Sequence, residues 1–316
     1  MKRLRKNPRE YLGKSVRTMP RKDVFPEPGF PLGVFPSLNQ GLLDYHVHEN
    51  FTELVLVTEG SGVHEIAGQS YPIVAGDVFL VLGDLVHCYS EGFGLAIVNV
   101  IFNWEELGLP QFDVGELAAF QSLFVIDPVN TDPDRFDHRF RLEPDDFNTV
   151  LHLVNELDTL LNRHRGRPGE HFLALSRFME LIARLLEAYE RTADSGVTAG
   201  IPHRLGALVG MLEKNYAENI TVETMCRQTG MSYASLFRHF RHYYHDTPVN
   251  YLIGQRLRRA EELLRKRLEL SVGEIALAAG FGDSAYFSRK FSERYGIAPS
   301  AYRRGRGPAE KPDSNA

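Results

Sequence analysis

Four residues in the first third of the chain have side chains that could bind a metal ion or a polar ligand together. They are three histidines and one glutamate, His46, His48, Glu53 and His87. Three imidazole nitrogens and one carboxylate could converge on a transition metal and leave a coordination position open for chemistry. The same groups could instead line a pocket and form hydrogen bonds with the hydroxyl groups of a small ligand. They could also satisfy one another in a half-buried position, and the residue types alone leave all three interpretations open.

A second group of residues near the end of the chain is suited to DNA, and it falls on the outer faces of two predicted helices. Arginine can form two hydrogen bonds with a guanine edge, small residues let a helix approach DNA closely, and lysine or arginine suits phosphate contacts. The residues predicted to be exposed are Ala234, Ser235, Phe237, Arg238, Arg241 and His242 on the first helix, and Ser284, Ala285, Ser288, Arg289 and Lys290 on the second.

These two helices belong to a segment, Thr221 to Arg304, in which one pattern occurs twice. The offset between the copies is 50 residues up to the glycine of each copy and 51 residues after it. The corresponding positions are Thr221 and Ser271, Gly230 and Gly280, Leu236 and Phe287, Arg238 and Arg289, Phe240 and Phe291, and Pro248 and Pro299. An internal repeat of this size indicates a duplicated supersecondary unit.

Each copy has the pattern of a helix, a sharp turn and a second helix. In the second copy, Ser271 and Glu274 have the spacing of a capping box, and Gly280 permits the left-handed turn that ends the helix. In the first copy, Thr221 and Ser232 stand at the capping positions. Two helices joined in this way are typical of the helix-turn-helix, whose second helix enters the DNA major groove.

The charge distribution supports an interaction with nucleic acid. Residues 201–308 contain 17 Lys and Arg against 10 Asp and Glu, although the whole chain has a net charge of −5. A basic segment in an acidic protein is typical of nucleic-acid binding. Residues 1–22 are also basic, with nine Lys and Arg against one acid. They form either a disordered, solvated tail or an arm that adds non-specific affinity for DNA.

The doubled unit resembles the DNA-binding domain of AraC/XylS-type transcriptional regulators. The resemblance rests mainly on the second copy, in Gly280-Phe281, in the run from Tyr286 to Phe291 and in the run from Tyr295 to Pro299. It implies that a long helix, from Val249 to Lys266 after Pro248, joins the two units. The base-reading positions that it implies are Ala234, Phe237, Arg238, Ser284, Ala285, Ser288 and Arg289, while Arg241 and Lys290 suit phosphate contacts.

Two positions depart from the family pattern. Phe237 stands where a polar residue is commoner, so it either contacts a thymine methyl group or packs within the protein. His245 stands where the second copy has Gly296. Because a left-handed backbone costs a non-glycine residue energy, we expect a reshaped loop after the first recognition helix.

Predicted strands carry the three histidines and the glutamate. Between Leu42 and Phe102, short β-branched and aromatic runs alternate with glycine-containing turns, which predicts a small antiparallel barrel or jelly roll. This part resembles cupins through Gly41, His46, His48, Glu53 and Gly60 in the first motif, and through Gly76, Asp77 and His87 in the second. With the C-terminal match, the chain resembles sugar-sensing AraC-type regulators, including those of rhamnose operons. Weaker candidates for the same site, in which a packing or surface role is commoner, are His64, Tyr71, Asn99 and Trp104.

Two amphipathic helices are predicted after the strands, the first from Pro144 and the second from about Phe172. One apolar face should cover the barrel and another should meet a second subunit. The resemblance likewise implies that these helices contribute to dimerisation. The preceding stretch, Phe112 to Arg141, has no clear period, so we predict a surface connection with short helical pieces.

The predicted fold is multi-domain α+β, with an N-terminal cupin-like antiparallel β-barrel, an α-helical dimerisation segment and a C-terminal all-α double helix-turn-helix. The predicted divisions are a basic tail and extended segment at 1–36, the cupin-like effector-binding domain at 37–130, the helical dimerisation segment at 131–192, a linker at 193–200, the DNA-binding domain at 201–304 and a disordered tail at 305–316.

The sequence therefore predicts a cytoplasmic transcription factor, with no enzymatic activity and no cofactor. We expect neither a membrane span nor a signal peptide, and the two cysteines fall in different predicted domains. The expected partners are double-stranded DNA, a monosaccharide as effector, a second copy of the chain and, as a further candidate, RNA polymerase. The alternative is a metal-binding cupin enzyme, or a metal sensor, fused to a DNA-binding module, with His46, His48, Glu53 and His87 as the metal ligands.

Overall fold

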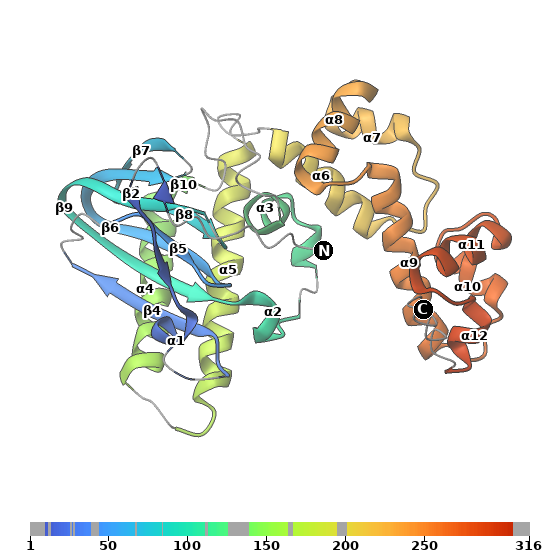
Figure 1. Cartoon of the computed structure of the whole chain (residues 1–316), viewed down its shortest axis with the longest axis horizontal. Coiled ribbons are helices and arrows are strands. Elements are labelled where there is room, and N and C mark those ends of the chain that lie inside the picture. The colour runs from blue at the N-terminus through green and yellow to red at the C-terminus, as the bar shows by residue number, and fades with distance from the viewer. Residues whose placement is uncertain are drawn as a thin grey trace, which may run out of the picture. The chain divides into compact units, whose positions relative to one another are not determined.

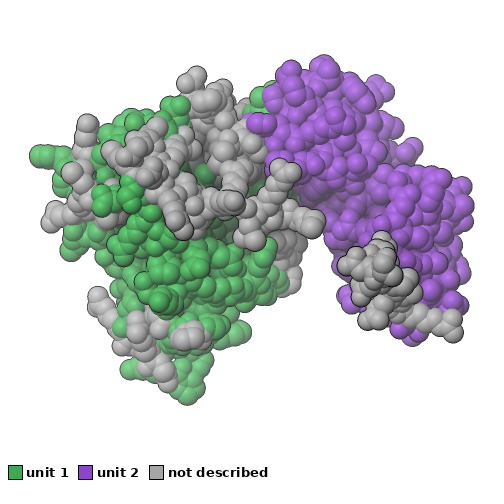
Figure 2. Space-filling model, in the orientation of Figure 1, with its two compact units in different colours: residues 1–206 green, residues 207–316 purple. Residues whose placement is uncertain are grey.

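The computed structural model describes residues 10–11, 14–25, 27, 29–38, 44–66, 68–83, 85–110, 113–125, 139–163, 167–194 and 201–305. The chain divides into two compact units, residues 1–206 and residues 207–316, which Figure 2 shows in different colours. Residues 195–200 of the predicted linker, and the predicted tail beyond residue 305, lie outside the described residues. Within the described ranges, no helix is long and apolar enough to cross a membrane.

Unit 1 contains a curled sheet of eight strands, visible in Figure 1. The strands pair in the order β10-β8-β6-β9-β5-β3, while β4 pairs with β9 and β7 pairs with β6. Their bounds are β3 Arg17–Met19, β4 Leu32–Ser37, β5 His46–His48, β6 Thr52–Ile66, β7 Gln69–Val74, β8 Asp77–Leu82, β9 His87–Phe102 and β10 Arg139–Arg141. A separate hairpin consists of β1 Glu10–Tyr11 and β2 Lys14–Ser15.

The predicted cupin-like antiparallel barrel is confirmed as a curled half-barrel, with one exception to its antiparallel pairing. The short strand β3 pairs in parallel with β5. Arg17, Thr18 and Met19 therefore belong to the sheet, so the interpretation of residues 1–22 as a disordered tail is wrong for this part. Residues 1–9 of that basic segment lie outside the described residues.

Two long strands, β6 and β9, curl the sheet around its own interior. β6 pairs with β8 along its first half and with β7 along its second half, and it pairs with β9 along both. The sequence indicated a turn near Gly60, but β6 continues through this stretch with register shifts. Gly60 has φ +70°, and a Cβ atom there would lie only 2.2 Å from the Gly94 carbonyl oxygen. A glycine is therefore required where the two strands approach most closely.

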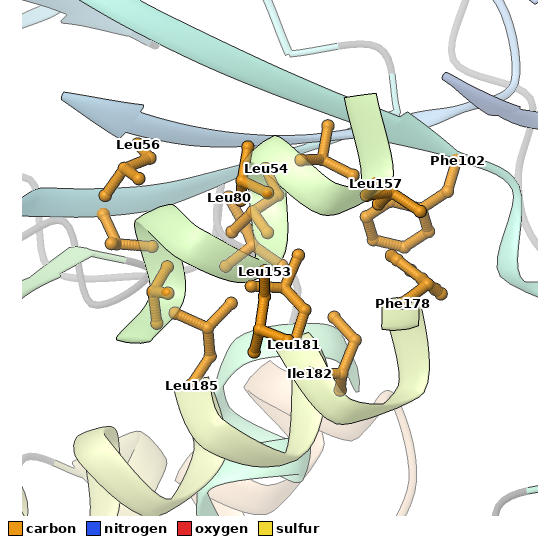
Figure 3. Close-up of a cluster of buried hydrophobic side chains, with 14 of the residues drawn as sticks. Leu54, Leu56, Leu80, Phe102, Leu153, Leu157, Phe178, Leu181, Ile182 and Leu185 are labelled. Atoms are coloured by element: carbon orange, nitrogen blue, oxygen red, sulfur yellow. The ribbon is translucent and has the colours of Figure 1, made fainter. Parts of the chain in front are cut away.

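Two long helices, α4 (Pro144–Asp158) and α5 (Glu170–Asp194), cover one face of the sheet. Figure 3 shows Leu54 and Phe102 from the strands packed against Leu157 and Phe178 from the helices. The predicted amphipathic helices, and the prediction that an apolar face covers the barrel, are confirmed. α4 continues into a π-helical turn over residues 159–163.

The alternation of side chains along the strands gives the sheet a second, inner face. Leu54 and Leu56 face the helices, whereas Val55 and Val57 lie inside the curl. Phe79, Leu95, Ile97 and other apolar residues complete this inner cluster. Because side chains alternate with a period of two, Glu53 shares the inner face with Val55 and Val57.

The segment between the strands and α4 has the predicted short helical pieces, but not the predicted surface position. Its described part contains η1 (Val114–Glu116), α3 (Ala118–Phe120) and η2 (Gln121–Val125). Ala119, Phe120 and Leu123 are buried in the core shared with α5, so this part is not a surface connection. Two further short helices, α1 (Arg21–Val24) and α2 (Trp104–Leu107), lie in unit 1.

The second unit consists of helices. Its first helix, α6, begins before the division between the units and ends within unit 2. The bounds are α6 Ile201–Lys214, α7 Val222–Thr229, α8 Tyr233–Tyr244, α9 Pro248–Lys266, α10 Val272–Ala278, α11 Ser284–Tyr295 and α12 Pro299–Arg303. The predicted double helix-turn-helix is confirmed as α7 with α8 and α10 with α11, joined by the predicted long helix α9.

The ends of these helices follow the sequence signals closely. Thr221 and Ser232 accept hydrogen bonds from backbone amides at the starts of α7 and α8, and Ser271 and Glu274 form a complete capping box on α10. The expectation of a reshaped loop after α8 is wrong. His245 takes the left-handed conformation itself, with φ 56°, and so ends α8 much as glycine ends α11.

Candidate functional site

The residues predicted to contact DNA lie on α8 and α11, the second helices of the two helix-turn-helix units. On α8 they recur at spacings of three, four and seven residues and share one side, whereas on α11 Ser284, Ala285, Ser288 and Arg289 recur at spacings of three and four and Lys290 follows them. Six of them are exposed, Ala234, Arg238, Arg241, Ser284, Ala285 and Arg289, and three are half-exposed, Phe237, Ser288 and Lys290.

The opposite sides of α8 and α11 anchor the two helices. Leu236 and Phe240 of α8 are fully buried. Phe287 and Phe291 of α11 are also fully buried, and they share a core with Ile275 of α10 and with residues of α9. Each predicted DNA-contacting side is therefore presented by a helix whose other side is packed.

A tyrosine orients the basic residues of α11. The guanidinium carbon of Arg289 lies 5.3 Å from the centroid of the Tyr286 ring, and the Lys290 ammonium lies 6.0 Å from it. Lys290 also forms an ion pair with Glu293 at 2.7 Å, and this hydrogen bond raises the pKa of the lysine. Lys290 would have to leave this carboxylate to reach a phosphate, whereas the cation–π contact leaves the Arg289 side chain exposed.

Two aromatic residues, Tyr233 and Phe237, lie in the first turns of α8. The rings of Phe237 and Tyr233 stack, with centroids 4.2 Å apart and planes 21° apart. Tyr233 is 60% exposed and was not among the predicted residues. Phe237 thus packs on a neighbour and keeps part of its surface accessible, so both roles considered for it remain compatible with its position. An aromatic at the first position of a recognition helix was the signal that could have drawn attention to Tyr233.

The second candidate site lies inside the curled sheet of unit 1. β5 supplies His46 and His48, β6 supplies Glu53 and β9 supplies His87. All four are buried, with 0–5% of their surface exposed. One nitrogen from each histidine and one carboxylate oxygen all lie within 4.8 Å of one another. The structure therefore brings together all four residues singled out from the sequence, while Gly41 of the same motif lies outside the described residues.

Backbone carbonyls fix the orientation of two of the imidazoles. His46 Nδ1 lies 3.0 Å from the carbonyl oxygen of Asp44, and His87 Nδ1 lies 3.0 Å from that of Leu85. Because a carbonyl oxygen can only accept, each Nδ1 donates, and Nε2 is the ring nitrogen left for a ligand. Metal-binding histidines are commonly held in this way by the ring nitrogen that does not bind the metal.

Glu53 lies close to two of the imidazoles without forming a hydrogen bond to either. Its Oε2 atom is 3.5 Å from Nε2 of His48 and 3.4 Å from Nε2 of His87. Neither these three atoms nor Nδ1 of His48 has a hydrogen-bond partner, although all are buried. A buried polar atom without a partner costs about 1–3 kcal/mol, so these atoms are available to a bound ligand.

Burial determines the ionisation of the cluster. Burial, with a smaller contribution from His87, lowers the pKa of His46 to about 4. Burial also lowers the pKa of His48 to about 3, against the opposing effect of Glu53. Burial alone would raise the pKa of Glu53, but the adjacent imidazoles of His48 and His87 outweigh it and hold this pKa at about 2. Near neutral pH the cluster thus contains a carboxylate and at least two uncharged imidazoles.

The donor set fits a divalent transition metal. Zinc, iron, nickel and copper bind imidazole nitrogen readily, and carboxylate oxygen is a usual additional ligand. Both the uncharged imidazoles and the ionised carboxylate are in the protonation state that metal binding requires. Such an ion, when bound, would supply a positive charge and coordination positions for a polar ligand.

Two further polar residues line the same interior. His64 of β6 is 1% exposed, and its ring lies 5.6 Å from that of His87 and stacks on Tyr89 at 5.1 Å. The Tyr89 hydroxyl is buried without a hydrogen-bond partner, and burial raises its pKa. His64 was only a weaker candidate in the sequence, and Tyr89 was missed. The signal for both was their strand register, since β6 and β9 pair His64 with Tyr89 directly.

Sequence comparisons place both sites in known domain families. Residues 37–121 match an AraC-like ligand binding domain, and residues 225–305 match a helix-turn-helix domain. The HTH-type transcriptional activator RhaS of Enterobacter sp. (strain 638) is 30% identical over 289 residues, which cover 90% of this chain and 96% of the relative. RhaS of Salmonella typhimurium is 31% identical over 284 residues, covering 90% and 96% respectively.

Solved structures similar to this chain include DNA-binding domains of the same type. The DNA-binding domain of AdpA, in complex with a target DNA, is 30% identical and covers 32% of this chain and 91% of its own, with a TM-score of 0.31. A probable AraC family transcriptional regulator from Rhodopseudomonas palustris is 27% identical and covers 31% of this chain and 92% of its own, with a TM-score of 0.29.

The matched domains define a DNA-binding transcriptional regulator with a ligand-binding domain, and the matched relatives are transcriptional activators. The identity to RhaS activators over nearly the full length of both proteins shows that the chain belongs to the AraC family of transcriptional regulators.

Proposed function

We propose that this regulator binds DNA through α8 and α11 and responds to a small polar effector, a monosaccharide, bound in unit 1. The observation that carries the proposal is the combination, in one chain, of two exposed basic recognition helices with a buried polar cluster inside a curled sheet. The sugar as effector class is supported by the resemblance to sugar-sensing AraC-type regulators. The candidate effector-binding groups are His46, His48, Glu53 and His87.

Each chain reads two adjacent segments of DNA. A recognition helix occupies one major groove, and successive major-groove faces recur about one helical turn apart. The base-reading residues are Ala234, Phe237, Arg238, Ser284, Ala285, Ser288 and Arg289, and Arg241 and Lys290 contact phosphates. Because α9 is a continuous helix of 19 residues, it acts as a stiff connection between the two units. Each chain consequently recognises an asymmetric half-site.

The effector acts through its different affinities for two arrangements of the protein. A ligand that binds one arrangement more tightly shifts the population towards it, and DNA affinity changes by the same coupling free energy. The change in DNA affinity therefore depends on the difference between the effector's affinities for the two arrangements. It does not depend on how tightly the effector binds either one.

The regulator acts as a dimer through α5. Phe172, Leu173 and Met179 of this helix are 77%, 51% and 38% exposed, although α5 also contributes buried residues to the core. A second copy of the chain would cover such apolar surface. The Phe172→Glu variant should therefore sediment as a monomer at concentrations at which the parent is a dimer. Arg184→Ala, on the same helix, serves as the control, and a dimer in both variants would exclude this surface.

The experiment that tests the proposal is fluorescence anisotropy with labelled DNA from the region flanking the protein's own gene. Titrations at fixed salt concentration, with and without each of a panel of monosaccharides, measure affinity and stoichiometry. One sugar should change either quantity. Tight binding to DNA with no effect of any sugar would retain the DNA-binding function and reject the monosaccharide.

A further inference from the structure

We propose that Tyr233 and Phe237 of α8 form one apolar contact surface for the 5-methyl groups of thymine. Such a contact rests on the proposed function, because it requires α8 to lie in the major groove of DNA. It deepens that function by adding Tyr233 to the base-reading residues and by naming the base that the two rings select. The DNA segment that faces α8 should accordingly contain thymine, whereas the segment that faces α11 has no such requirement.

The two recognition helices are alike along one row of residues and different along the next row. Residues four apart are neighbours on the surface of a helix, so they form such rows. One row is an alanine followed by an arginine in both copies, Ala234 and Arg238 on α8, Ala285 and Arg289 on α11. The other row differs at every position, with Tyr233, Phe237 and Arg241 on α8, and Ser284, Ser288 and Ser292 on α11. The two helices therefore differ mainly in what this second row recognises.

The two aromatic rings of this row are held against each other without being buried. Their centroids lie 4.2 Å apart and their planes are 21° apart. Tyr233 is nevertheless 60% exposed, and Phe237 is half-exposed. The other side of α8 anchors the helix, since Leu236 and Phe240 are fully buried there. The rings thus present apolar surface in a fixed arrangement, and they lose less conformational freedom when a ligand covers them.

Thymine is the base that presents an apolar group in the major groove. Its C5 methyl group lies beside the O4 acceptor, whereas guanine, adenine and cytosine present hydrogen-bonding groups. The ring of Phe237 cannot form such hydrogen bonds, but contact with a methyl group removes apolar surface from water on both sides. Serine can donate or accept a hydrogen bond, so Ser284 and Ser288 do not select the methyl group.

The position of the pair along α8 places it over bases and not over the DNA backbone. Tyr233 is the first residue of α8, and the N-terminal residues of a recognition helix contact base edges. Arg241 continues the same row one turn after Phe237 and is exposed. A phosphate contact by this arginine would fix the register of the helix on DNA. The aromatic pair would then lie within the groove.

The test compares thymine with deoxyuridine, which lacks only the methyl group. The full-length protein first selects its operator from a random DNA library, with and without the panel of monosaccharides. Each thymine of this operator is then replaced in turn, and anisotropy at fixed salt concentration measures the affinity. At one or two adjacent positions, the replacement should weaken binding by the parent about fourfold, the value expected when one methyl-sized apolar group is no longer buried.

Variants connect this methyl effect to the two rings. Tyr233→Ser and Phe237→Ser give α8 the residues that α11 has at the equivalent positions, so serine is compatible with this type of unit. Each variant should bind the thymine and deoxyuridine operators equally at one or more positions where the parent distinguishes them. Circular dichroism shows whether each variant is folded, and Tyr233→Ser carries the test alone if Phe237→Ser does not fold.

Two controls separate the methyl contact from other roles. Tyr233→Phe keeps the ring and should keep the distinction, because the contact does not use the hydroxyl group. Arg289→Ala, on α11, should weaken binding to both operators and leave the ratio of their affinities unchanged.

The outcomes distinguish the methyl contact from the proposed function. If no replacement weakens binding by the parent more than about twofold, the methyl contact is rejected and the DNA-binding function stands. An unchanged distinction in both serine variants would also reject it. Loss of the distinction in Tyr233→Phe would reject the methyl contact for Tyr233 and assign a hydrogen bond to its hydroxyl group. If the parent selects no sequence, the proposed function fails, and the methyl contact fails with it.

Discussion

A single arginine on α11 combines exposure with a fixed orientation. Arg289 lies over the Tyr286 ring, so its guanidinium loses less conformational freedom when it meets a base edge. Arg289→Ala should weaken binding to the specific operator by about 1–3 kcal/mol and relax the preference at one base pair. Anisotropy titrations on operator and random DNA, with Arg184→Ala in unit 1 as the control, check this. An equal loss on both DNAs would show that Arg289 contacts only phosphate.

A second residue-scale effect concerns the backbone. His245 adopts φ 56°, a left-handed conformation that costs a non-glycine residue about 1 kcal/mol. His245→Gly should therefore stabilise unit 2 by about 0.5–1 kcal/mol, and Gly296→Ala, at the equivalent position, should destabilise it by about 1 kcal/mol. Urea denaturation followed by circular dichroism measures both changes. The fluorescence of the single tryptophan, Trp104 in unit 1, is the control. It should show the same unfolding midpoint for unit 1 in the parent protein and in both variants, because both substitutions lie in unit 2. If His245→Gly lowered the free energy of unfolding, the claim that the His245 backbone is strained would be wrong.

Residue types identified the buried cluster but not all of its surroundings. His46, His48, Glu53 and His87 could be selected because their chemistry and spacing are unusual in a strand-rich segment. His64 and Tyr89 could not be selected in this way, because each has ordinary neighbours in the sequence. Their position beside the cluster depends on the register between β6 and β9, which only long-range pairing determines.

Among the strands, the close approach of β6 and β9 can be tested by substituting two glycines, Gly60 and Gly83, that have similar backbone conformations. Gly60 and Gly83 have φ +70° and +60°, but a Cβ atom at Gly60 would collide with the backbone of β9, whereas nothing lies within 4 Å at Gly83. Gly83→Ala should cost about 1 kcal/mol from backbone strain alone. Gly60→Ala should cost about 3 kcal/mol or more, because strands must also separate. Trp104 fluorescence during urea denaturation gives both values. Equal costs would show that the sheet accommodates the methyl group easily.

Local signals predicted the helices better than the strands. The caps at Thr221, Ser232 and Ser271 and the turn at Gly280 are determined by neighbouring residues, and the structure has all of them. The extent of β6 was underestimated, because a Gly-rich stretch resembles a turn until a partner strand pairs with it. The burial of α3 was missed for a related reason, since a three-residue helix has no period and its apolar residues pack on the distant α5.

At the scale of the whole molecule, the two units should be separable in function. Unit 2 contains both helix-turn-helix units and a core of its own. The fragment that begins at Ile201 should therefore bind operator DNA without the rest of the chain, with lower affinity if dimerisation is lost, and with no response to any sugar or metal. Anisotropy at low salt measures this. Failure of the correctly folded fragment to bind would count against the assignment of α8 and α11.

The duplication has a consequence for the sequence and orientation of the half-sites in an operator. α8 presents Ala234, Phe237 and Arg238, whereas α11 presents Ser284, Ala285, Ser288 and Arg289, so the two copies have the same architecture but different chemistry. A single chain thus has polarity along the DNA, and a half-site read backwards is a different half-site. The orientation of two half-sites, as a direct or an inverted repeat, consequently records the symmetry that relates two bound chains.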